Sequence, residues 1–178
     1  MKNILLIGGE GYIGNVLSTF LLKSGYKVTS FDRLIYNNGY LVLNNVNNKH
    51  YKFIYGDMVK KQDLEPALDE IDTVVLLAGL VGDPITKKYP QEAAIINELG
   101  IRNSIDLCVE KNIDQLIFIS TCSNYGLTED GVLASETHEL QPLSLYAKAK
   151  TSTEDYILSL IGKTKMNPTI LRFATAFG

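Results

Sequence analysis

The fold of this chain is decided by residues 2–14, which read KNILLIGGEGYIG. Ile4 to Ile7 form an unbroken apolar run, which is typical of a strand buried on both faces of a parallel sheet. Four glycines follow, at positions 8, 9, 11 and 14, and the apolar spacing of residues 15–23 then predicts a helix. A strand, a glycine turn and a helix in this order form the context in which a dinucleotide-binding fingerprint is found.

The glycines satisfy G-x-G-x-x-G from Gly9 to Gly14, and Gly8 adds a second frame, G-x-x-G-x-x-G. A tight turn after the strand needs a residue that accepts positive φ. A backbone that approaches a pyrophosphate leaves no room for a Cβ, and Gly14 lets the helix pack close to the sheet. The N–H groups and the positive dipole end at the start of the helix would then face the two phosphates.

A second apolar strand, Val28 to Phe31, ends in Asp32, eighteen residues past Gly14. An acidic residue at about this distance is expected to bind the adenosine ribose hydroxyls. A carboxylate repels a 2′-phosphate, so Asp32 favours NAD over NADP, and Arg33 softens this preference slightly. An ordinary glycine-rich turn with a surface aspartate is the alternative interpretation.

The composition is that of one globular domain, with 178 residues of which 46% are hydrophobic and 21% charged. The net charge is −3 and there is no basic block, which argues against a nucleic-acid partner. No apolar run reaches the length needed to cross a bilayer, and the chain begins directly with a core strand. Cys108 and Cys122 form neither a metal spacing nor a disulfide framework, and we expect a cytoplasmic protein without a metal site.

Apolar strands alternate with helical segments at a spacing of about thirty residues, which predicts a doubly wound parallel α/β sheet of the Rossmann type. The helix over residues 15–23 should bury a stripe formed by Val16, Leu17, Phe20 and Leu21. Further strands are expected at residues 27–31, 53–55, 73–77, 116–119 and 169–173, and further helices at residues 62–68, 91–111 and 144–161. Residues 37–48 hold six asparagines, which we interpret as compositional drift around a short helix at residues 40–43 rather than as a flexible loop beside the adenosine.

Tyr146 and Lys150 are four residues apart in the last predicted helix and therefore share one face of it. A phenol is a poor base at neutral pH, but a neighbouring ammonium stabilises the phenolate and lowers its pKa. Tyr146 could then remove a proton from a substrate hydroxyl while hydride leaves the same carbon. Thr121 follows the strand at residues 116–119, where its hydroxyl could hold the substrate oxygen.

Further segments in matching order and spacing connect these features to a known family. They are residues 8–14, Asp32, residues 56–58, residues 77–79, Asn97 with Gly100, residues 118–126, residues 142–146 with Lys150, and residues 171–172 continuing to Phe177 and Gly178. On these segments the sequence resembles the extended short-chain dehydrogenases/reductases, specifically the NAD-dependent nucleotide-sugar epimerase/dehydratase group.

The resemblance implies that residues 1–178 form an NAD-binding Rossmann domain and that a C-terminal substrate domain is largely absent. It also implies a catalytic set of Thr121, Tyr146 and Lys150. The implied cofactor-binding residues are Gly8, Gly11, Tyr12, Ile13, Gly14, Asp32, Asp57, Met58, Leu77, Ala78, Gly79, Asn97, Tyr146 and Lys150. Asn97 would lie behind the active site, and Lys150 would hold the nicotinamide ribose and tune Tyr146.

Two departures from the family pattern narrow the expected reaction. The 4,6-dehydratases carry an Asp-Glu pair directly after the catalytic threonine, where this chain has Cys122 and Ser123. We expect Cys122 to be a small buried residue, because nothing nearby marks a base for a reactive thiol. The usual Asn-x-Tyr-Gly near the end is replaced by residues 175–178, which read TAFG, so one sugar-phosphate contact is altered.

The expected function is NAD-dependent epimerisation of a nucleotide-activated sugar through a transient keto intermediate. An NAD(P)H-dependent ketoreductase or a dehydratase is the alternative within enzymes, and a non-catalytic dinucleotide-binding module is the alternative outside them. The resemblance also implies a homodimer formed through the helices at residues 91–111 and 144–161.

Overall fold

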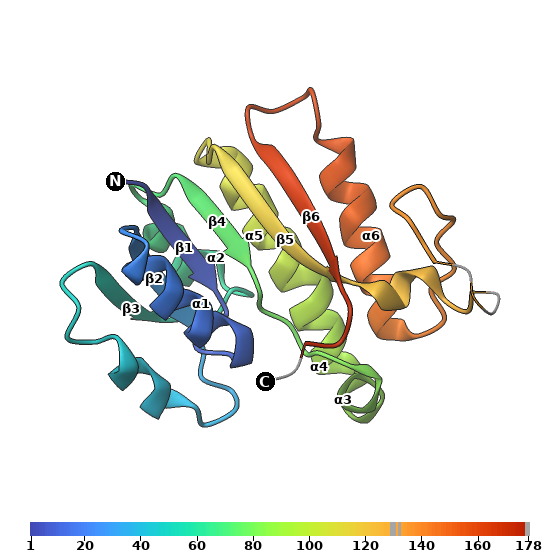
Figure 1. Cartoon of the computed structure of the whole chain (residues 1–178), viewed down its shortest axis with the longest axis horizontal. Coiled ribbons are helices and arrows are strands. Elements are labelled where there is room, and N and C mark those ends of the chain that lie inside the picture. The colour runs from blue at the N-terminus through green and yellow to red at the C-terminus, as the bar shows by residue number, and fades with distance from the viewer. Residues whose placement is uncertain (129–130, 132, 177–178) are drawn as a thin grey trace.

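Six parallel strands form one sheet in the order β3-β2-β1-β4-β5-β6 (Figure 1). The computed structural model describes residues 1–128, 131 and 133–176, so Phe177 and Gly178 of the family match lie outside the described residues. The strands are β1 (Asn3–Ile7), β2 (Lys27–Asp32), β3 (Tyr51–Tyr55), β4 (Thr73–Leu76), β5 (Gln115–Thr121) and β6 (Asn167–Phe173). The predicted doubly wound sheet is confirmed, and its order reverses between β1 and β4, which is where such sheets bind ligands.

Helices cover both faces of the sheet, with α1 on one face and α5 and α6 on the other (Figure 1). The α-helices are α1 (Tyr12–Lys23), α2 (Lys61–Leu64), α3 (Asp83–Lys88), α4 (Pro90–Ala94), α5 (Ile101–Glu110) and α6 (Leu145–Ser159). The 3-10 segments are η1 (Gly39–Asn44), η2 (Glu65–Leu68) and η4 (Cys122–Tyr125), and η3 (Ile95–Gly100) is a π-helical segment. In the described part of the chain no helix combines the length and apolar character needed to cross a bilayer.

Alternate residues of β1 belong to two different apolar clusters, as expected for a strand buried on both faces. Leu5 and Ile7 pack into the larger cluster with α5 and α6, and Ile4 and Leu6 pack into the smaller one on the side of α1. On this second face Leu171 and Phe173 of β6 stay 36% and 39% exposed. No helix among the described residues lies over this end of the sheet (Figure 1).

The predicted apolar stripe of α1 is wrong in two positions, because Val16 and Phe20 are 71% and 64% exposed. The helix instead buries Gly14 and Ser18, and Leu17, Leu21 and Leu22 pack against the sheet. A Cβ on Gly14 would lie 2.6 Å from the carbonyl oxygens of Gly8 and Gly9. The close contact between the glycine loop and the helix start therefore sets the rotation of α1, and the largest side chains do not.

The helix predicted at residues 91–111 is present but is not uniform. It runs through α4, the π-helical η3 and α5, with helical backbone at each junction. The short helix α3 was not predicted, and a proline near its start fits its position. The last helix, α6, begins after Ser144, whose hydroxyl accepts a hydrogen bond from the Ala147 N–H at 3.1 Å.

The asparagine-rich segment contains the predicted short helix as η1, but compositional drift does not account for three of its six asparagines. Asn38 donates a side-chain hydrogen bond to the carbonyl of Glu10. Asn44 donates to the side chain of Asn15 at 2.8 Å, and Asn45 accepts from the Thr19 hydroxyl at 3.1 Å. These amides attach residues 38–45 to the glycine loop and to α1, and the sequence shows no partner for them because all three bonds are long range.

Candidate active site

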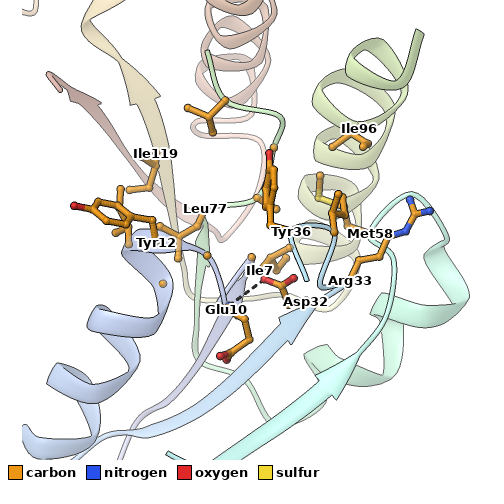
Figure 2. Close-up of a pocket in the computed structure, with 18 of the residues that line it drawn as sticks. Ile7, Glu10, Tyr12, Asp32, Arg33, Tyr36, Met58, Leu77, Ile96 and Ile119 are labelled. Atoms are coloured by element: carbon orange, nitrogen blue, oxygen red, sulfur yellow. Dashed lines mark hydrogen bonds between the residues drawn. The ribbon is translucent and has the colours of Figure 1, made fainter. Parts of the chain in front are cut away.

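A cavity of about 800 Å³ lies at the carboxyl ends of β1, β2, β4 and β5, and the segment that follows β6 also borders it. The structure brings fourteen of the fifteen predicted site residues to its walls. They are Gly8, Gly11, Tyr12, Ile13, Gly14, Asp32, Asp57, Met58, Leu77, Ala78, Gly79, Thr121, Tyr146 and Lys150. Figure 2 shows Tyr12, Leu77 and Ile119 gathered at one end of this cavity and Met58, Arg33 and Asp32 at the other.

The glycine loop fits the phosphates of a dinucleotide. Gly8 has a φ of +87°, and a Cβ there would lie 2.7 Å from the backbone nitrogen of Ala78. The N-cap residue of α1 is Gly11, and no side chain caps this helix start. A helix start leaves N–H groups without intrahelical partners, so the loop and the positive dipole end can receive an anion at this wall of the cavity.

Asp32 ends β2 and holds its carboxylate in place with two backbone donors. The Leu34 N–H lies 2.7 Å from one oxygen and the Glu10 N–H lies 3.0 Å from the other. Burial is the largest cause that raises the pKa of Asp32, the two backbone hydrogen bonds oppose it, and the nearby charge of Glu10 adds to it. The position matches that of a carboxylate that accepts from the ribose hydroxyls.

The far end of the cavity has a wall suited to an adenine ring. Met58 is only 6% exposed and lines the cavity beside Ile96 of η3 (Figure 2). Arg33 forms an ion pair with Asp57, with 3.0 Å between Nη1 and Oδ2. Tyr36 also lines this region. It could not be predicted from the sequence, because a surface tyrosine in a loop has no distinguishing local pattern.

The catalytic candidates come from β5 and α6. Tyr146 and Lys150 are only 8% and 3% exposed, and both border the cavity. The Lys150 ammonium donates to the carbonyl of Ile119 at 2.8 Å and lies 5.9 Å from the ring centroid of Tyr146. Thr121 is 8% exposed, and its hydroxyl accepts from the Ser123 N–H at 3.1 Å. The structure thus places all three side chains on the same cavity as the glycine loop.

Burial lowers the pKa of Lys150 to about 8, and the negative charge of Glu154 acts in the opposite direction. The amine is therefore mainly protonated at neutral pH. It can stabilise a phenolate on Tyr146 and still donate to a ribose hydroxyl, because an ammonium has three donors and one is used by Ile119.

Replacing Lys150 by methionine is expected to raise the free energy of unfolding at pH 7 by about 1–3 kcal/mol, because it removes a buried charge. The pKa of Lys150 is lower in the folded chain, so between about pH 8 and 10.5 the unfolded chain binds more protons. Wild-type stability therefore rises with pH across this window, and the advantage of the variant shrinks.

Urea unfolding at several pH values measures this difference, with Lys148→Met as the control because Lys148 is exposed on the same helix. The expectation fails if Lys150→Met and Lys148→Met show the same dependence on pH.

A buried ion pair lies close to the catalytic candidates. Glu154 is 1% exposed, and Arg172 of β6 contacts its carboxylate through Nη2 at 2.6 Å and through Nε at 3.0 Å. Ser120 and Asn124 donate to the same carboxylate. The hydrogen bond with Glu154 is the largest cause that raises the pKa of Arg172. This network joins α6, β5, η4 and β6 around Thr121. No local sequence pattern distinguishes Glu154, although it lies four residues after Lys150 on the same helix.

Asn97 is the one predicted site residue that does not border the cavity. Its amide oxygen accepts from the Leu80 N–H at 2.8 Å, and its amide nitrogen donates to the Leu80 carbonyl at 3.0 Å. A Cβ on Gly79 would lie 3.0 Å from this amide oxygen. Asn97 therefore lies behind the loop of residues 78–80 and holds it in place.

The expectation that Cys122 is buried is wrong. Cys122 is exposed and borders the cavity beside Thr121, because it starts the 3-10 turn η4 and leaves the sheet there. Cys108, by contrast, is buried, and burial raises the pKa of its thiol to about 12. Within the described residues, His, Cys, Asp and Glu side chains nowhere gather in threes that could ligate a metal ion.

A Rossmann-type sheet with a glycine loop, a carboxylate at the end of β2 and Thr, Tyr and Lys side chains on one cavity is typical of dinucleotide-dependent enzymes. The model of the NAD dependent epimerase/dehydratase family matches residues 4–178, and the chain belongs to this family. UDP-glucose 4-epimerase of Rhizobium meliloti (strain 1021) is 27% identical over 185 residues, which cover 99% of this chain and 52% of that protein. dTDP-D-glucose 4,6-dehydratase of Mus musculus is 26% identical over 182 residues, which cover 99% of this chain and 51% of that protein.

The chain is also similar in structure to solved epimerases. UDP-glucuronic acid 4-epimerase from Bacillus cereus, in complex with UDP-glucuronic acid and NAD, aligns with a TM-score of 0.87 and 29% identity. The alignment covers 96% of this chain and 55% of that one. The chain spans about half the length of the curated relatives it matches. The cofactor of the family is NAD, and the glycine loop, the Asp32 carboxylate and the cavity fit that molecule.

Proposed function

We propose that this protein epimerises a nucleotide-activated sugar, at C4, through a transient 4-keto intermediate. The observation that carries the proposal is that Thr121, Tyr146 and Lys150 line the same cavity as the glycine loop. Two of the matched proteins are named as 4-epimerases of UDP-sugars, which supports this substrate class. In this proposal residues 1–178 act as the NAD-binding domain and supply the catalytic side chains.

The chain's own residues divide the proton chemistry among them. NAD, when bound, supplies a hydride acceptor and donor beside the sugar carbon. Tyr146 takes the proton from the sugar hydroxyl. It returns the proton after the keto sugar has rotated and presents its other face. Lys150 stabilises the phenolate by its charge, and Thr121 holds the reacting oxygen by a hydrogen bond. All three side chains are at most 8% exposed, so little of their surface is accessible to bulk water.

The residues beside Thr121 favour epimerisation over dehydration. Elimination of water needs an additional acid and base near the sugar, and Cys122 and Ser123 stand where the dehydratases of the family carry Asp and Glu. Cys122 borders the cavity but carries no carboxylate. Epimerisation needs only the proton acceptor Tyr146, a hydroxyl that binds the reacting oxygen (Thr121), the Lys150 ammonium and the cofactor.

A scan of nucleotide sugars with the protein expressed from its complete gene tests the proposal. We expect NMR and mass spectrometry to show two C4 epimers of equal mass, with no net accumulation of reduced cofactor. Stoichiometric consumption of NADH or NADPH would identify a ketoreductase, and loss of one water from the sugar would identify a dehydratase. Binding of NAD without any turnover of the panel would support a non-catalytic module. Each of these three outcomes contradicts the proposal.

We also propose that the helices at residues 91–111 and 144–161 form a homodimer contact. Five apolar side chains within these two ranges are about half exposed or more, which is costly for a surface left in water. They are Ile95, Leu99, Leu145, Leu158 and Ile161. Sedimentation equilibrium is expected to give a dimer mass for the wild type and a monomer mass for Leu99→Glu/Leu145→Glu. A monomeric wild type at micromolar concentration would contradict this contact.

A further inference from the structure

Glu10 lies within the glycine loop, yet its side chain is fully buried. One carboxylate oxygen accepts from the Ser30 hydroxyl at 2.6 Å and from the Tyr51 hydroxyl at 2.5 Å. The other oxygen accepts from the amide of Asn15 at 3.1 Å. An ionised carboxylate can only accept hydrogen bonds, and here three donors from α1, β2 and β3 converge on it.

The charge of this carboxylate has no counter-ion in the described part of the chain, where no lysine, arginine or histidine forms an ion pair with Glu10. A buried charge without an opposite partner is costly, and its field is screened less than that of a surface charge. Burial is the largest cause that raises the pKa of Tyr51, and the bond to Glu10 adds to it. The negative charge of Glu10 also raises the pKa of Asp32.

The surroundings of Glu10 are the ribose end of the cofactor cavity. Its backbone N–H donates to the Asp32 carboxylate at 3.0 Å, and its carbonyl accepts from the Asn38 side chain. Figure 2 shows the Glu10 carboxylate directed away from Asp32, on the side of the loop opposite to Tyr36. The Asp32 carboxylate therefore lies at the cavity where a 2′-substituent of the ribose would approach, and the Glu10 carboxylate lies behind it.

A cation that borders this end of the cavity, Arg33, is already ion-paired. Arg33 directly follows Asp32 and pairs with Asp57 at 3.0 Å. A 2′-phosphate would need such a guanidinium to offset the two carboxylates, because like charges in a poorly screened site repel strongly.

We propose that Glu10 is a specificity-determining residue of the cofactor site, whose buried charge behind Asp32 excludes the 2′-phosphate of NADP and thereby selects NAD. The role rests on charge and not on contact, because the carboxylate points away from the cavity. It predicts that removing the charge weakens the discrimination between the two cofactors.

Glu10→Gln tests the proposal by calorimetric titration of the chain with NAD⁺ and with NADP⁺. We expect the affinity for NADP⁺ to rise roughly tenfold and the affinity for NAD⁺ to change by less than about threefold, since only the 2′-phosphate carries the additional charge. The matched control is Tyr51→Phe, which removes one donor to Glu10 but leaves its charge. This control is expected to keep the wild-type ratio of the two affinities.

A second pair of variants covers the case in which Glu10→Gln does not fold. Glu10→Met/Ser30→Ala/Tyr51→Phe replaces the carboxylate and two of its donors by apolar groups of similar shape, which is better tolerated than an orphaned partner. Its charged control is Tyr51→Phe, in which the carboxylate keeps the donors Ser30 and Asn15. The proposal is overturned if the triple variant and Tyr51→Phe bind NADP⁺ and NAD⁺ in the same ratio. The proposal is also overturned if Glu10→Gln lowers the affinities for NAD⁺ and NADP⁺ by the same factor, because a purely structural role would give that result.

Discussion

Replacement of Tyr146 by phenylalanine is expected to lower the turnover number at least a hundredfold and to leave the affinity for NAD⁺ within about threefold of wild type. The ring is 8% exposed, so phenylalanine fills the same space and only the hydroxyl is lost. That hydroxyl is the proton acceptor of the proposed reaction, and a positioned acid or base typically contributes 10²–10⁴-fold. Rates of epimerisation and calorimetric titrations with NAD⁺ give the two quantities separately.

Tyr156→Phe is the matched control for this variant. Tyr156 lies on the same helix, but its hydroxyl donates to Asp106 at 2.5 Å, and it does not border the cavity. We expect this control to keep its turnover while it loses about 1 kcal/mol of stability with the hydrogen bond. A Tyr146→Phe variant that retained more than a tenth of the wild-type turnover would remove Tyr146 from the proton transfer.

Replacement of Arg172 by methionine is expected to lower the free energy of unfolding by about 3–5 kcal/mol, because it leaves the carboxylate of Glu154 buried without its cation. The additional change Glu154→Gln should recover most of this loss. Its amide oxygen can still accept from Ser120 and Asn124, and no charge remains to be compensated. Urea unfolding at pH 7 of the wild type, both single variants and the double variant measures the coupling.

Lys61→Met is the surface control for this cycle. Lys61 pairs with Glu110 at 3.4 Å, but the two side chains are 44% and 60% exposed, so we expect a loss below about 1 kcal/mol. Equal losses in Arg172→Met and Lys61→Met would show that the buried pair does not hold β6 against α6. A larger loss of stability in Arg172→Met than in Lys61→Met would show that burial makes the ion pair costly to break.

Several features of the molecule follow from local sequence patterns alone. The run of apolar residues in β1, the glycines at positions 8–14 and Asp32 at the end of β2 predict the sheet and the cofactor loop. Tyr146 and Lys150 share a helix face because of their spacing. Each of these features depends on backbone conformation within one strand, turn or helix, and such conformations are encoded within a few residues.

Other features depend on which distant segments meet. Cys122 is exposed because the chain leaves the sheet at Thr121, and Asn97 faces Leu80 and not the cavity. Helix α1 turns Val16 and Phe20 outward, against its own apolar pattern, because the glycine loop must pack at its start. These outcomes are decided by contacts between segments, which a local pattern does not contain.

The fold class, the glycine loop and the catalytic candidates can be predicted from the amino-acid sequence, since each is a short pattern with a local physical cause. That Glu10 is buried next to Asp32 and that Glu154 pairs with Arg172 depends on how distant segments pack in the folded chain. Partners of a buried carboxylate are brought together across separate strands and helices. The free energy that makes such a carboxylate tolerable therefore exists only in the folded chain.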